Sequence, residues 1–337
     1  NAGARFVIDR LARYVPGDIQ LGQIKGTLAG DLRLEGFNFR SSDWEVSANH
    51  VRLRWKPLGM LGGWIQIAQL YLEDVKVNDL HPEVTTPSDF TWPNVPGMLS
   101  WLKARIRSFH IAGITYNKAG NKAMSIEKVT AQAIWYLGMM NVKEILITAP
   151  EGSFYGILGA NFANHKISLQ GRLLPHQALY GLDEHRIILK LAEEKKQRDI
   201  NGTIRIISMA GNSERVKLTT SVSILKGAIT LNEIELREMG RSGALRGSVG
   251  IDMFPVEHPF KINLVFDGLG LSRELESTKT VSGMLEVKGD VKGYKGLFNV
   301  QTRGKPWAQI DAAADFEGNY DGIHASNLQG KFMNGTV

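Results

Sequence analysis

The chain has 337 residues, of which 43% are hydrophobic and 22% charged, and its 40 basic and 34 acidic residues leave a formal charge of +6. This balance is typical of a globular protein and excludes an intrinsically disordered chain. The absence of cysteine excludes disulfides, thiolate metal sites and thiol catalysis. It suits a cytosolic protein, and equally a bacterial envelope protein that avoids oxidative cross-linking.

The ends of the chain suggest a piece of a longer protein. It begins with Asn1 rather than Met and stops at Val337 inside a turn-rich pattern. No apolar run approaches the roughly 20 residues that span a bilayer, and no signal peptide precedes the fold. The basic surplus is typical of a mixed, solvated surface, with a weak preference for anionic lipid headgroups as the alternative.

Residues 1–15 have helical spacing and predict an amphipathic N-terminal helix. Phe6, Val7 and Leu11 share one face, and Pro16 with Gly17 ends the pattern. This helix is either the tail of a membrane anchor or a plug for the end of a β structure.

Residues 16–78 predict a first β segment, because apolar residues fall on every second position. Leu32 and Leu34 alternate, and Gly36 resets the phase to Phe37 and Phe39, as a β-bulge would. Residues 79–105 interrupt the strands with four prolines and predict a structured crossover that contains a short helix over residues 98–104.

Residues 106–337 predict a continuous run of strands. The stretch PFKINLVFDG, residues 259–268, is representative: alternate residues are apolar, and Val265 is the exception on the polar side. Strands recur roughly every 8–15 residues with no helix between them, which predicts an antiparallel meander. The fold class is therefore mainly β, with on the order of 20 strands in one long sheet that must curl or close.

Sequence features of an active site are missing. No two of the eight histidines have the spacing of a metal site, and no G-x-S-x-G motif is present. Gly268 and Gly270 lack the lysine of a phosphate loop, and basic residues with aromatics do not cluster as in nucleic-acid binding. We expect no enzyme, no metal and no cofactor.

A sheet with one apolar face must bury that face. It can close into a barrel, pack on a second sheet, or curl into an open apolar groove. An open groove needs an apolar filling, and acyl chains are the natural one. The alternating residues predicted to line such a lipid-binding groove, which would equally form the core of a sandwich, are Val216, Leu218, Val222, Ile224, Leu245, Val249, Ile251, Ile262, Leu264, Phe266, Leu285, Val287, Phe298 and Val300.

Two stretches resemble the N-terminal part of TamB-type, AsmA-like envelope proteins. They are LARYVPGDIQLGQIKGTLAGDLRLEGFNF from Leu11 and VRLRWKPLGMLGGWIQIAQLYLEDVKV from Val51, and SGMLEVKGDV from Ser282 is similar. The resemblance lies in the rhythm of glycines and strands and covers most of the chain.

The resemblance implies a taco-like β-groove that carries phospholipid across the periplasm of a Gram-negative-type envelope. It also implies an inner-membrane anchor helix, absent from this chain, and an Omp85-family outer-membrane barrel as a partner, contacted through a region beyond this chain. Two other readings stay open: a chaperone for outer-membrane barrel proteins that accepts a client strand at a sheet edge, and a structural scaffold with a closed core.

Overall fold

The structure is a computed structural model. It describes residues 17–27, 30–80, 101–118, 123–194, 199–225, 227–240, 243–253, 257–270, 280–290, 292–303, 310–319, 322–332 and 335–336. The predicted helix of residues 1–15 and most of the predicted crossover lie outside these ranges. The chain divides into two compact units. Unit 1 comprises Asn1–Glu83 and Pro93–Tyr180, and unit 2 comprises Val84–Trp92 and Gly181–Val337.

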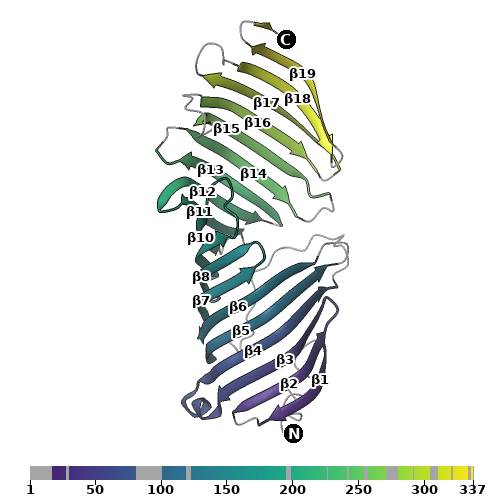
Figure 1. Cartoon of the computed structure of the whole chain (residues 1–337), viewed down its shortest axis with the longest axis vertical. Coiled ribbons are helices and arrows are strands. Elements are labelled where there is room, and N and C mark those ends of the chain that lie inside the picture. Colours follow the sequence, from purple (N-terminus) through teal and green to yellow (C-terminus); the bar gives the residue numbers. More distant parts are fainter. Residues whose placement is uncertain are drawn as a thin grey trace. The chain divides into compact units, whose positions relative to one another are not determined.

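Unit 1 contains strands β1 to β9, which lie side by side in chain order (Figure 1). Their bounds are β1 Asp18–Gly26, β2 Asp31–Arg40, β3 Trp44–Lys56, β4 Ile65–Asp79, β5 Lys103–Lys118, β6 Met124–Tyr136, β7 Met139–Ala149, β8 Gly152–Asn161 and β9 Lys166–Pro175. A short 3-10 helix, η1 Pro57–Gly62, connects β3 to β4.

Unit 2 contains strands β10 to β20, again in chain order. Their bounds are β10 Glu184–Glu194, β11 Asp199–Ala210, β12 Ser213–Leu225, β13 Ala228–Glu238, β14 Ala244–Asp252, β15 Phe260–Gly270, β16 Thr280–Gly289, β17 Tyr294–Arg303, β18 Ile310–Asn319, β19 Gly322–Phe332 and β20 Gly335–Thr336. The mainly β fold and the number of strands agree with the prediction.

The prediction of a purely antiparallel meander is wrong at one point. Strands β4 and β5 are parallel, with Ile65 opposite Ala104 and Val77 opposite Tyr116, and their arrows point the same way in Figure 1. The segment between them is long enough to return the chain to the end of the sheet from which β4 started. The alternation of apolar and polar residues could not reveal this. It shows which face of the sheet a residue occupies, and not whether the neighbouring strand runs parallel or antiparallel.

The helix predicted over residues 98–104 does not reach its predicted end, because β5 begins at Lys103. Among the residues that the structure describes, η1 is the only helical segment, and no helix has the length and hydropathy needed to cross a membrane.

The β-bulge predicted at Gly36 is wrong, because the β2–β3 pairing continues across Gly36 without a shift in register. Gly36 has a φ of +75°, a left-handed conformation that glycine adopts without steric cost. Before it Leu34 lies opposite Val51, and after it Phe37 lies opposite Ala48, so both strands change phase at the same level. Apolar pairs therefore lie on both sides of Gly36.

The sheet of each unit is open and curled. Within the described ranges, β1 and β9 do not pair with each other in unit 1, nor do β10 and β19 in unit 2. Every substantial contact between strands joins neighbours in the hydrogen-bonded ladder. No second layer of described strands covers either face.

One ion pair fixes the start of β2 against β3 and makes a pH prediction. The Arg52 guanidinium donates to both carboxylate oxygens of Asp31, at 3.1 and 2.7 Å, and these hydrogen bonds lower the Asp31 pKa from 3.8 to about 2. Because the folded pKa is depressed, the stabilisation is fully present above about pH 4 and is lost as the pH falls through about 2. We expect Asp31→Asn to lower the midpoint of thermal unfolding slightly at pH 6 and by much less at pH 2. An equal difference at both values would contradict the ion pair.

Candidate functional site

The fourteen predicted groove residues share one face of the unit 2 sheet. Leu264 lies opposite Gly247 on β14 and Leu285 on β16, and Leu285 in turn lies opposite Phe298. Residues directly opposite each other on neighbouring strands point to the same side of a sheet. The register therefore brings these side chains together, although they come from strands spread over more than 80 residues.

An unbroken row of apolar residues and glycines crosses ten strands of unit 2. We call a set of directly opposite residues on successive strands a row. This row consists of Leu191, Gly202, Val222, Leu231, Val249, Ile262, Val287, Gly296, Phe316 and Ala325. It runs perpendicular to the strands, so it forms an apolar path along the sheet rather than along one strand.

Unit 1 has the same kind of row, which the predicted site did not include. One residue from each of nine strands forms it: Ile24, Leu34, Val51, Leu72, Ile111, Val129, Ile147, Phe154 and Leu173. The signal for it was the same period-two alternation. We name the side of each sheet that carries its row the apolar face of that unit.

The apolar face is the more sheltered side of each sheet. Its central residues are half-buried, and Val222 is 6% exposed. Apolar residues of central strands on the opposite side are more open: Val265 is 58% exposed and Ile157 49%. A flat single sheet would expose both sides alike, so the difference indicates that each sheet curls toward its apolar face.

Aromatic rings cover glycines on the apolar face. Phe266 is directly opposite Gly283, and a β-carbon added to Gly283 would come within 2.8 Å of the Phe266 ring. Phe316 covers Gly296 in the same way, and in unit 1 Phe154 covers Gly171. Such pairs fill the space above a strand glycine with a neighbouring ring. The rings therefore occupy the space that a side chain at each glycine would fill.

A few polar groups interrupt the apolar face near β10 to β12. His185 Nδ1 lies 2.8 Å from Ser208 Oγ, and Ser208 is buried. Thr220 is buried as well, and its hydroxyl donates to the Asn232 carbonyl at 2.9 Å. These groups were not predicted, because a serine, threonine or histidine in an alternating pattern cannot be assigned to the apolar side from sequence.

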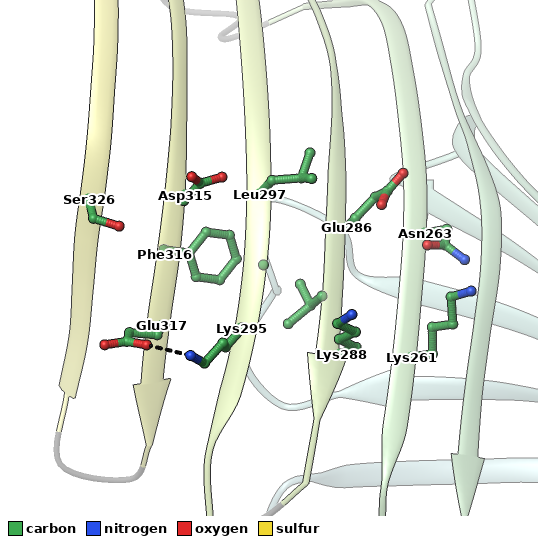
Figure 2. Close-up of a pocket in the computed structure, with 12 residues that line it drawn as sticks. Lys261, Asn263, Glu286, Lys288, Lys295, Leu297, Asp315, Phe316, Glu317 and Ser326 are labelled. Atoms are coloured by element: carbon green, nitrogen blue, oxygen red, sulfur yellow. Dashed lines mark ion pairs between the residues drawn. The ribbon is translucent and has the colours of Figure 1, made fainter.

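One hollow in unit 2 lies on the opposite, polar side (Figure 2). It measures about 500 Å³ and is lined mainly by polar and charged residues of β15 to β19. Lys261, Lys288 and Lys295 lie opposite one another across three strands, and Lys295 Nζ is 3.2 Å from Glu317 Oε2. Carboxylates line it too, so it is a solvated surface of mixed charge and not a site for acyl chains.

No set of three histidine, aspartate or glutamate side chains in the described part of the chain is arranged to hold a metal ion. The feature that both units share is the apolar face.

Comparison with known protein families identifies one part of the chain. Residues 1–151 match the family model described as TamB, N-terminal domain. This match spans β1 to β7, and with them seven of the nine residues in the apolar row of unit 1. No curated protein and no solved structure matches the chain. Residues 1–151 form a TamB-type N-terminal region.

Proposed function

We propose that this protein carries phospholipids between the inner and outer membranes of a Gram-negative envelope, with their acyl chains lying on its apolar faces. The single observation that carries the proposal is the unbroken row of apolar residues and glycines across every described strand of each sheet but the two-residue β20. Such a face, without a second protein layer over it, is typical of a binding surface.

The physics of burial suits transport. Burying apolar surface is worth about 0.8 kcal/mol per methylene, so a 16-carbon chain gains on the order of 12 kcal/mol as an upper bound. The hydrophobic effect has no preferred direction within the face. Neighbouring strands offer similar apolar residues about 4.8 Å apart, so an acyl chain meets no single deep well as it moves from strand to strand.

The TamB-type region supports the rest of the proposal. We infer that the protein works in the periplasm, held at the inner membrane by a segment outside this chain. An Omp85-family barrel is the proposed partner at the outer membrane. No catalytic step is required, because the acyl chain is bound and released unchanged.

Photo-crosslinking from adjacent positions on opposite faces tests the proposal. A photoreactive amino acid at Leu264 would report on the apolar face, and the same residue at Val265 is the matched control, because Val265 is apolar and more exposed but lies on the opposite side. We expect phospholipid adducts from Leu264 and few or none from Val265, in protein purified from cells and analysed by mass spectrometry.

Equal labelling at both positions would indicate unspecific lipid association and would contradict the proposal. A well-folded sample with no lipid at either position would also contradict it, and would favour a scaffold or a chaperone that binds protein strands.

A further inference from the structure

Exposed apolar residues from three separate segments lie together where several strands of the unit 1 sheet begin or end. We define the rim as residues 57–64, 101–103 and 136–139. The parallel pairing of β4 and β5 creates it, because it places the starts of both strands at the same edge, with Ile65 opposite Ala104. Strand β6 ends there as well, with Tyr136 opposite Lys103, and β7 begins there at Met139.

The apolar side chains of the rim point into solvent. Leu58 is 77% exposed, Leu61 87% and Trp101 66%, and Met60, Leu137 and Met139 are exposed as well. None of the residues of η1 is buried. Scattered single apolar residues are normal on a protein surface. Six exposed apolar residues that lie together form a patch, and such patches are typical of binding sites.

The turn that presents these residues is well built. Gly63 closes η1 with a φ of +74°, and its N–H donates to the Met60 carbonyl at 2.9 Å. The Trp64 N–H donates to the Gly59 carbonyl at 3.0 Å. Because backbone hydrogen bonds hold the turn, the exposure of Leu58 and Leu61 is a property of the fold.

Aromatic and cationic groups gather around Trp64, which follows η1 in the chain. The rings of Trp64 and Tyr136 stack with centroids 6.0 Å apart, and Lys103 Nζ lies 5.3 Å from the Tyr136 centroid and 6.0 Å from that of Trp64. Tryptophan, tyrosine and lysine are the residues that settle at the boundary between headgroups and acyl chains, since each joins an apolar body to a polar tip.

The sequence in and around the rim is mainly basic. Residues 53–69, 101–126 and 132–143 contain no aspartate or glutamate, whereas Lys56, Lys103 and Arg105 lie in or beside the rim. The nearest acidic residue across the β2–β3 ladder is Asp31, opposite Arg54. A basic surround with an apolar tip complements an anionic lipid surface. A protein partner would instead need a shaped counterpart to leucines that protrude around a turn.

We propose that the rim docks on an anionic phospholipid bilayer, with Leu58, Met60 and Leu61 inserted at the headgroup boundary and the lysines at the phosphates. The rim is separate from the apolar face, and the proposal does not depend on lipid transfer, because a rim can rest on a bilayer whether or not the face carries lipid. If both proposals hold, the rim would hold the sheet against the membrane.

Vesicle sedimentation with a matched variant tests the docking. The probe is vesicles of phosphatidylethanolamine and phosphatidylglycerol, compared with vesicles of phosphatidylcholine alone. The rim variant carries Leu58→Asp and Leu61→Asp, and the control variant carries Leu179→Asp and Tyr180→Asp, which change two exposed apolar residues at the opposite edge of the same unit. Circular dichroism checks that both variants fold.

We expect the wild type and the control variant to bind the anionic vesicles equally. The rim variant should bind about 100-fold more weakly, since it loses the burial of two leucines and gains two negative charges. Binding to phosphatidylcholine alone should be weaker for every protein, and added salt should weaken anionic binding. Equal binding by the rim variant and the wild type would overturn the proposal.

A fluorescent probe locates the contact itself. The chain has no cysteine, so Met60→Cys and Leu179→Cys each create one labelling site for an environment-sensitive dye. We expect the dye at position 60 to shift to the blue on adding anionic vesicles and the dye at position 179 to stay unchanged. A dye at position 60 that remains in water while the protein sediments with the vesicles would place the contact elsewhere and contradict the rim.

Discussion

Replacing Leu264 with aspartate is expected to lower the phospholipid that co-purifies with the protein at least about tenfold, because an acyl chain crossing β15 would have to desolvate an unpaired carboxylate. Leu264 lies near the middle of the apolar face, between Gly247 and Leu285. Lipid phosphorus per mole of protein is the measurement, made on protein extracted in the same mild detergent.

The same substitution should leave unit 2 folded. The apolar face is not covered by a second described layer, so the new carboxylate can reach water, and we expect a loss of stability of only about 1 kcal/mol. In a closed core it would be buried without a partner and would cost several times more. Global unfolding of Leu264→Asp would therefore contradict the open face.

Val265→Asp provides the control for this prediction. It places the same charge one residue away, on the polar side, where Val265 is 58% exposed. We expect normal lipid content and normal stability. If both variants lost lipid equally, the loss would reflect a general effect of charge on β15 rather than a block of the apolar face.

The assignment of residues to faces could be predicted from the sequence, because alternation is a local property. Leu264 and Val265 are both aliphatic, yet the pattern of their neighbours placed them on opposite sides, and the register agrees. The phase reset at Gly36 was equally local. It follows from a glycine that can take a left-handed conformation, with apolar residues out of phase on either side.

The arrangement of strands relative to one another could not be predicted in this way. The parallel pairing of β4 with β5 depends on a connection whose path the alternation does not encode. The rim depends on that pairing, since Trp64 and Lys103 are far apart in sequence and meet only because both strands start at the same edge. The left-handed backbone of Glu233 was also beyond prediction, because glutamate does not favour it.

Gly283→Ala should destabilise unit 2 by about 1–3 kcal/mol, the usual cost of overpacking. The new methyl group would collide with the backbone carbonyl of Asn299 and lie 2.8 Å from the Phe266 ring. The carbonyl belongs to the ladder and cannot move freely, so the ring and the strand must shift together. Chemical denaturation followed by tryptophan fluorescence and circular dichroism measures the change.

Gly250→Ala is the matched control, and its effect should be absent or opposite in sign. Gly250 is also a strand glycine of unit 2, but the nearest atom to an added β-carbon is Thr230 Oγ1 at 3.9 Å. Alanine there restricts the unfolded chain without a clash and should be neutral or stabilise by up to about 1 kcal/mol. Equal destabilisation by both changes would mean that strand glycines in this sheet are needed for flexibility rather than for space.

A double-mutant cycle separates the energetic effect of the Phe266 ring from that of the Asn299 carbonyl. Combining Gly283→Ala with Phe266→Leu removes the contact with the ring and leaves the contact with Asn299, so the coupling energy reports the ring alone, at roughly 0.5–3 kcal/mol. A coupling near zero would contradict the close packing of Phe266 on Gly283. A clear coupling would mean that Gly283 leaves room for this ring, so that an alanine there displaces the ring from its place on the apolar face. Gly283→Ala should then also reduce bound phospholipid, whereas Gly250→Ala, on the other side of the sheet, should not.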